Sequence, residues 1–181
     1  MPEFAERGRM LLDIAREAIA SPSEPAARPW REAWLGERAA TFVTLRDSLG
    51  DLRGCIGTID PHRPLGEDVA HNAFAAAYRD PRFPPLREAE RATTAVEVSV
   101  LTPRVPFAAP TEADAVGRLE PGIDGLVFEY HGHRATFLPQ VWENIADPLD
   151  FLCELRRKAG LPARFWHPDV RLSRYGVEKH R

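Results

Sequence analysis

Long apolar runs are absent from this sequence of 181 residues, and lysine is scarce. A transmembrane helix needs ~20 consecutive apolar residues, so we expect no association with a membrane. Of the 24 basic residues, only Lys158 and Lys179 are lysines, and the formal net charge is −3. Nucleic-acid binding needs a concentrated basic surface, so this charge balance argues against nucleic acid as a partner.

Cysteine is equally scarce, with only Cys55 and Cys153, and neither belongs to a closely spaced pair of the kind that binds zinc. The neighbouring histidines His131 and His133 supply too few ligands for a metal site by themselves. The sequence also lacks a glycine-rich nucleotide loop and an ordered set of catalytic Ser, His and Asp residues. We therefore expect no metal and no cofactor. Two unlike cysteines, and an acidic N-terminus without an apolar leader core, predict a cytoplasmic protein.

The residues that are present describe an ordinary globular chain, with 44% hydrophobic and 28% charged residues. The length fits a single domain over residues 1–181, or two small subdomains within it. Pro103, Pro106 and Pro110 follow a predicted strand, and they mark the connection 103–110 as the best position for a seam between subdomains.

Periodicity and turn signals predict helices and strands that mix along the chain. Asp147 precedes Pro148 and is expected to cap the last helix, while Trp30 and Trp34 indicate a short helix of their own. Without a regular βαβ order, the class is α+β, a mixed or antiparallel sheet with helices packed on it, as two α/β subdomains that form a cleft. The predicted helices cover residues 3–20, 65–78, 111–119 and 148–159, and the predicted strands cover 41–46, 52–59, 95–101, 125–130, 133–138 and 170–175.

The stretch Leu52–Ile59 has the most unusual pattern, because Gly54 and Gly57 flank Cys55 inside a predicted strand. Glycine weakens a strand, and is used there for a bulge or for close approach by a ligand or by other backbone. Arg53 precedes Cys55 by two residues, and a cation favours the reactive thiolate if both side chains share one face. A free cysteine also packs as a small hydrophobic residue in many cores. On these grounds both interpretations of Cys55, reactive group and core residue, stay open.

Two further segments supply candidate ligand-binding side chains. His71 lies on the predicted helix 65–78, which can bring it toward Cys55, although a lone helical histidine is also common on a surface or in a core. Arg82 belongs to the proline-rich loop 79–85, where a guanidinium can clamp an anionic substrate. The same loop can equally end a helix and cover the core.

The run Leu52–Gly57, which contains the motif Arg-Gly-Cys-Ile-Gly, resembles the signature of the AMMECR-type domain family, also called AmmeMemoRadiSam system protein A. The family has no established reaction. The resemblance implies a pathway shared with a Memo-type protein, itself similar to metal-dependent dioxygenases, and with a radical-SAM protein. Further segments resemble the family in the same order and span nearly the whole chain: residues 42–45, 75–77, 80–86, 96–101, 135–142, 151–152, 155, 158–161 and 165–166.

Two hypotheses of function follow. In the first, the protein is an enzyme or enzyme component that binds a small organic or anionic substrate in a cleft at Leu52–Gly57, with backbone N–H groups as oxyanion or phosphate donors. In the second, it is a non-catalytic module that binds a ligand or the Memo-type and radical-SAM partners. The residues assigned to the site are Cys55 and Arg53 as catalytic groups, and Gly54, Gly57, Arg82 and His71 as substrate-binding groups.

Overall fold

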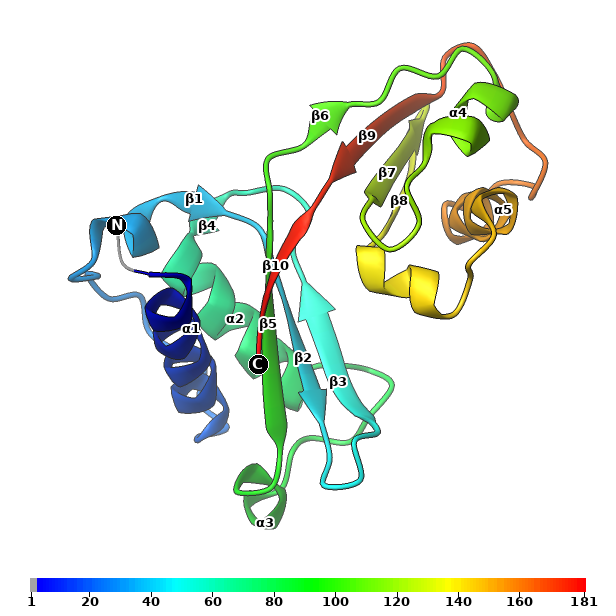
Figure 1. Ribbon diagram of the computed structural model, residues 1–181. Coiled ribbons are helices and arrows are strands. Elements are labelled where there is room, and N and C mark those ends of the chain that lie inside the picture. The colour runs from blue at the N-terminus through cyan, green and yellow to red at the C-terminus, as the bar shows by residue number, and fades with distance from the viewer. Residues whose placement is uncertain (1–2) are drawn as a thin grey trace. The chain divides into compact units, whose positions relative to one another are not determined.

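The computed structural model describes residues 3–181. The chain folds into two compact units (Figure 1). The first unit consists of the chain up to Leu101 together with the C-terminal residues Glu178–Arg181. The second unit is Thr102–Val177. The boundary therefore falls just before the proline-rich connection 103–110.

The first unit is built on a four-stranded sheet with the strand order β10-β5-β2-β3. Strand β2 pairs antiparallel with both β3 and β5, and a separate two-stranded sheet joins β1 to β4. The elements are α1 (Phe4–Ile19), a 3-10 helix (Ala33–Gly36), β1 (Arg38–Ala39), β2 (Thr41–Arg46), β3 (Leu52–Gly57), β4 (Arg63–Pro64), α2 (Leu65–Tyr78), α3 (Glu88–Arg91), β5 (Ala95–Leu101) and β10 (Val177–His180).

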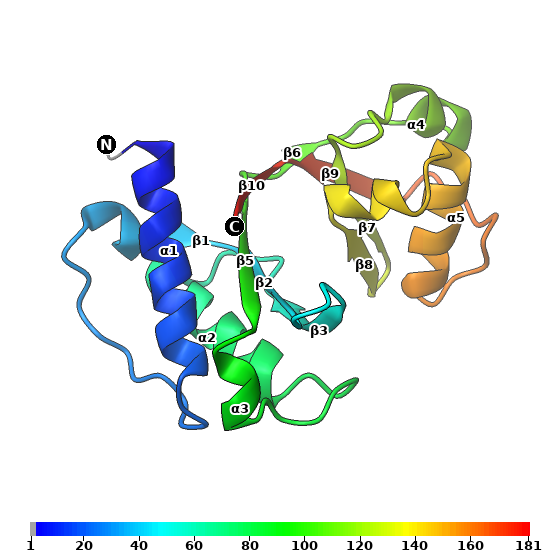
Figure 2. The same ribbon diagram turned by 60° about the horizontal axis from the view of Figure 1, so that its bottom comes forward.

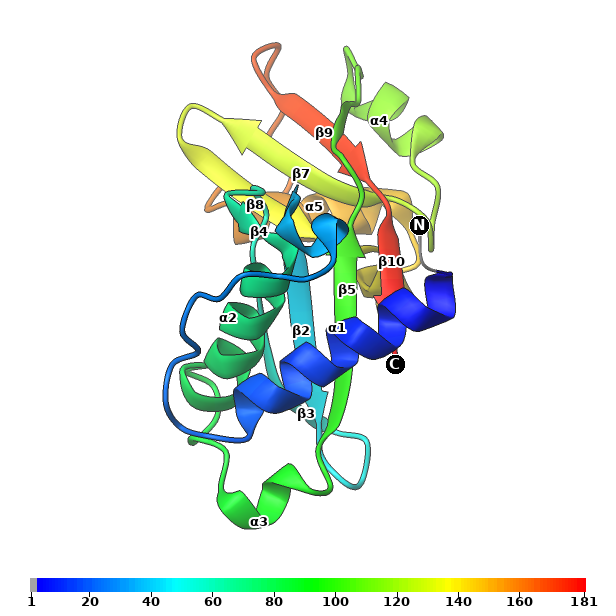
Figure 3. The same ribbon diagram turned by 90° about the vertical axis from the view of Figure 1, so that its left-hand side faces the viewer.

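Helices α1 and α2 lie together on one side of this sheet (Figures 2 and 3). Alternate residues of a strand point to opposite faces, so Val43 and Leu45 of β2 turn the same face toward the helices. The core of the first unit forms there, because those side chains are buried with Leu11 of α1 and with Val69 and Ala76 of α2. We call this side of the sheet the helix face and the other side the polar face.

The second unit has its own antiparallel sheet with the order β6-β9-β7-β8. Its core is aromatic: the rings of Trp142 and Phe151 stack with centroids 3.8 Å apart, and the Trp142 indole donates to the carbonyl of Asp124 at 2.7 Å. The elements are β6 (Val105–Pro106), α4 (Glu112–Arg118), β7 (Gly125–Tyr130), β8 (His133–Phe137), a 3-10 helix (Pro139–Glu143), α5 (Pro148–Lys158) and β9 (Arg171–Tyr175).

The α+β class predicted from the sequence is confirmed, and α2 and β5 have the predicted bounds. The short elements β1, β4, β6 and α3 were not predicted, because two to four residues are too few to show a period. Strand β10 also escaped prediction, since only Gly176 separates it from β9. The helix expected near the two tryptophans is a 3-10 turn that contains Trp34, whereas Trp30 precedes it.

Within residues 3–181, no helix is both long enough and apolar enough to cross a membrane.

The predicted start of α5 is confirmed in atomic detail. The Asp147 carboxylate accepts hydrogen bonds from the N–H groups of Leu149 and Asp150 at 2.9 and 3.0 Å. We expect Asp147→Ala to lower the free energy of unfolding by ~1 kcal/mol, because two helix N–H groups lose their acceptor. Asp147→Asn keeps an acceptor and should restore most of this loss. Thermal melts of the three proteins provide the measurement, and equal melting temperatures would contradict the assigned cap.

Candidate functional site

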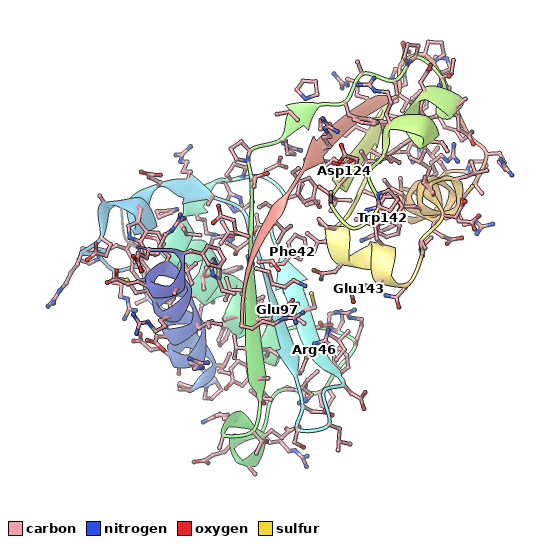
Figure 4. All side chains as sticks on the ribbon, viewed as in Figure 1. Phe42, Arg46, Glu97, Asp124, Trp142 and Glu143 are labelled. Atoms are coloured by element: carbon pink, nitrogen blue, oxygen red, sulfur yellow. The ribbon has the colours of Figure 1, made fainter. Side chains whose placement is uncertain are left out.

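The polar face of the first sheet carries a row of side chains across three strands. Thr44 points to this face because its neighbours Val43 and Leu45 point to the helices. Thr44 is the central residue of the row. The strand register pairs it with Cys55 of β3 on one side and with Glu97 of β5 on the other. Figure 4 shows Glu97 on β5, with Phe42 and Arg46 on β2.

Cys55 is partly exposed, and it forms no disulfide. The Thr44 hydroxyl lies 3.4 Å from the Cys55 sulfur and donates a hydrogen bond to it. Cys153, the other cysteine, is buried in the second unit, on α5. The structure therefore separates the two cysteines by environment: Cys55 is partly exposed, whereas Cys153 is buried.

A salt bridge in the loop after α2 holds the backbone of Cys55. Asp80 accepts the Cys55 N–H at 2.9 Å, and Arg82 donates to the Cys55 carbonyl at 3.1 Å. The two loop side chains also bind each other at 2.7 Å. The hydrogen bond from Arg82, assisted by the N–H groups of Cys55 and Arg82, holds the pKa of the Asp80 carboxyl far below its usual range. Asp80 is thus ionised at neutral pH and fixes this loop against β3.

Arg82 also interacts electrostatically with Cys55. Its pKa is raised chiefly by the hydrogen bond to Asp80, and the charge of Cys55 contributes in the same direction. About half of the Arg82 side chain, 54%, is exposed to solvent. Arg82 therefore combines proximity to Cys55 with a guanidinium surface on which an anion can bind.

Arg53, the cation that the sequence suggested as the partner of Cys55, is occupied elsewhere. A β-bulge interrupts the register, since Leu45 pairs with Gly54 and Arg46 with Leu52, which leaves Arg53 as the additional residue. Its guanidinium donates to both Glu90 oxygens, at 3.1 and 3.3 Å.

The hydrogen bond from Arg53 is the main reason why the pKa of Glu90 is lowered to about 2. The buried Arg53 therefore ties β3 to α3, where Glu90 lies.

The two glycines of the motif make room for parts of this protein. A Cβ on Gly54 would lie 2.2 Å from the carbonyl oxygen of Ala76, so glycine allows α2 to approach β3. A Cβ on Gly57 would lie 2.2 Å from the ring of Phe42. The N–H of Cys55 points to the outer edge of β3, and the strand alternation directs the Gly57 N–H to the same edge.

Glu97 is a site residue that the sequence analysis missed. Its buried carboxylate binds Lys179 at 3.3 Å and Arg181 at 2.6 Å, both from the C-terminal part of the chain. The sequence did contain a signal for Glu97, an acid among the alternating residues of the strand Ala95–Leu101. Alternation with the valines places Glu97 on the face of the strand opposite the helices. The sequence did not indicate these two cations as partners of Glu97, because β10 was not predicted.

His71 lies on α2, on the helix face of the sheet, whereas Cys55 lies on the polar face. Its Nδ1 is 3.7 Å from a carboxylate oxygen of Glu24, and burial lowers its pKa. It also lines a cavity of about 410 Å³ between α1, α2 and the segment that joins α1 to the 3-10 helix. The structure therefore does not bring His71 together with Cys55.

The histidines of the β7–β8 turn bind protein groups. His131 lies 3.1 Å from Asp169, and His133 lies 2.9 Å from the carbonyl of Ala159. Among residues 3–181, no three His, Cys, Asp or Glu side chains are grouped so as to hold a metal ion.

Comparisons with known proteins identify relatives over nearly the whole chain. The AMMECR1 family model matches residues 12–180. A protein from Methanothermobacter thermautotrophicus is 39% identical over 98% of this chain and 95% of its own length. Protein MK0488 of Methanopyrus kandleri is 37% identical over 92% of this chain and 84% of its own. The crystal structure of the uncharacterized protein PH0010 from Pyrococcus horikoshii is similar with a TM-score of 0.86 and 34% identity, over 97% of this chain and 91% of that one.

Proposed function

The chain belongs to the AMMECR1 family, and from that premise we propose that its first unit binds a small organic anion beside Cys55 and uses the Cys55 thiol as the reactive group. The observation that carries the proposal is the pairing of a partly exposed cysteine with the half-exposed side chain of Arg82. Arg82 replaces Arg53 in the role of electrostatic partner, because Arg53 is buried and bound to Glu90.

The proposed binding mode follows from the contacts of Arg82. One edge of its guanidinium is held by Asp80 and by the Cys55 carbonyl. Those bonds fix the side chain, so its exposed part meets a carboxylate or phosphate in a preset orientation. The Gly57 N–H, directed to the same edge of β3, is a second donor for the bound anion.

The proposed reaction is addition of the thiol to a carbonyl carbon of that anion. The sulfur–carbon bond forms as the π electron pair of the carbonyl moves to its oxygen, and this oxygen takes up the proton that the thiol releases. The Thr44 hydroxyl donates a hydrogen bond to the sulfur and holds it in position before attack. Arg82 lies near the developing oxyanion and stabilises its charge.

Alkylation of the two cysteines tests the proposal without knowledge of the natural substrate. We expect Cys55 to react faster than Cys153 with iodoacetamide, because Cys153 is buried. Iodoacetate carries the negative charge that Arg82 should attract. The ratio of the iodoacetate rate to the iodoacetamide rate at Cys55 should therefore fall ~5-fold in Arg82→Gln, since an exposed pair of charges contributes ~1 kcal/mol.

Arg79→Gln is the matched control for this experiment. Arg79 lies in the same loop and is as exposed as Arg82, but it pairs with Glu24. We expect its removal to leave the ratio at Cys55 unchanged. Peptide mass mapping after timed labelling gives both rates. Slow labelling of Cys55, or an equal ratio in all three proteins, would contradict the proposal.

The alternative function is a non-catalytic binding module that works with Memo-type and radical-SAM partners. Exposed leucines at the β2–β3 hairpin, Leu49 and Leu52, favour a protein contact next to the motif. The two functions predict different behaviour of Cys55. A binding module requires no preference of the thiol for an anionic reagent, so the iodoacetate ratio separates the two.

A further inference from the structure

The cavity of about 410 Å³ that His71 lines is on the helix side of the first unit, away from the polar face that carries Cys55. It is bounded by α1, by α2 and by the connecting segment 21–30. Its apolar walls come from α1, α2 and the segment, in the form of Ile14, Ala18, Ala70 and Trp30. A volume of this size accommodates a small organic molecule.

The connecting segment is fastened over the cavity by ion pairs. Arg28 donates two hydrogen bonds of 2.8 Å to Glu17 of α1, and its guanidinium lies 4.8 Å from the ring centre of Trp30. Glu24 of the same segment binds Arg79 at the end of α2, at 2.8 Å. The segment is therefore fixed to both helices, and the space below it is a formed cavity.

The charges around the cavity leave one carboxylate without a counterion. Arg28 is neutralised by Glu17, and Arg63, on the cavity wall, is neutralised by the fully buried Asp68 at 3.1 Å. Glu67 also lines the cavity and has no ion pair among the described residues. Among the described residues, Glu67 is thus the one charged side chain of the cavity wall that has no ion-pair partner.

His71 lies one helical turn after Glu67, on the same wall. Burial lowers the pKa of its imidazole, so the ring is neutral at neutral pH and does not repel a cation. A carboxylate and a neutral imidazole together offer hydrogen-bond acceptors to an ammonium group, while the apolar walls offer contact to a hydrocarbon body.

We propose that this cavity is a binding site for a small amine, a monocation whose ammonium group binds Glu67 and His71 and whose apolar body packs against Ile14, Ala18 and Trp30. The site is separate from the proposed reaction at Cys55 and does not depend on it.

Three compounds of similar size and different charge test the proposal by isothermal titration calorimetry: 2-phenylethylamine, 2-phenylethanol and 3-phenylpropionate. We expect the intact protein to bind the amine at least tenfold more tightly than the alcohol, and to bind the acid least. Glu67→Gln should remove the preference for the amine over the alcohol. Glu88→Gln is the matched control, since Glu88 is an exposed acid of α3 outside the cavity, and this variant should keep the preference.

A second variant tests the cavity itself. Ala70→Leu fills space between the walls without a change of charge, and it should weaken binding of the amine and the alcohol by a similar factor. The proposal would be overturned if the amine showed no saturable binding, if it bound no better than the alcohol, or if Glu67→Gln left the preference intact. Thermal melts establish that each variant is folded before titration.

Discussion

Arg156→Ala is expected to lower the free energy of unfolding by ~3–5 kcal/mol, the range measured when one partner of a buried ion pair is removed. The Arg156 side chain is fully buried in the second unit, at 0% exposure. Its guanidinium donates to Glu112, to the carbonyls of Phe165 and Leu152, and to the sulfur of Cys153. Removal of the guanidinium takes one hydrogen bond from each of these acceptors and opens a cavity beside α5. Glu112 keeps a second ion pair, with Arg164 at 3.7 Å.

The next residue of α5 supplies the control for this expectation. Arg157 has 60% of its side chain exposed and, among the described residues, pairs only with Glu154 one turn earlier. Arg157→Ala should change stability by no more than ~0.5 kcal/mol, as is usual for a surface pair. Denaturant unfolding of the three proteins gives the comparison. An Arg156→Ala protein as stable as Arg157→Ala would show that the buried network contributes little.

Gly54→Ala should lower the free energy of unfolding by ~1–3 kcal/mol, the usual range for overpacking a core. The added methyl group meets the backbone carbonyl of Ala76 rather than a flexible side chain, so α2 itself must shift. Gly117→Ala, in α4, is a control of opposite sign. Outside its own helix turn, no described atom lies within 4 Å of the added Cβ. Alanine favours a helix over glycine, so stability should rise by up to ~1 kcal/mol.

The same variant separates two roles of Gly54. If the glycine serves helix packing, Gly54→Ala lowers the melting temperature. If the glycine serves ligand access beside Cys55, the variant keeps its melting temperature and loses alkylation at Cys55. Unchanged stability together with slow labelling would therefore favour the role that the sequence pattern suggested.

The sequence predicted what is encoded between near neighbours. The apolar period of residues 65–78, the alternation of Ala95–Leu101 and the cap at Asp147 each depend on residues within one or two turns, and each is found in the structure. These signals are local because helix caps and side-chain alternation are fixed by the backbone itself.

Side-chain partners that are distant in sequence escaped prediction. Arg53 and Glu90 stand 37 residues apart, and no local pattern selects that pair over the closer Cys55. The bulge that leaves Arg53 unpaired in the ladder became visible only through the register of β2 with β3. Glu97 and Arg181, 84 residues apart, meet because β10 joins the sheet. The end of the sequence did not show that it forms two strands, β9 and β10, so this pairing was not predicted.

The Asp80–Arg82 pair has a consequence for the behaviour of the protein at high concentration. Strand β3 is at the edge of its sheet, and an exposed edge is a template on which the strand of another molecule can assemble. In the middle of β3, the N–H of Cys55 is taken by Asp80 and its carbonyl by Arg82. The two side chains mimic one peptide group of a neighbouring strand. They thereby end the sheet at β3. A strand of another molecule cannot form the central pair of hydrogen bonds with β3, and this opposes the growth of aggregates by strand addition.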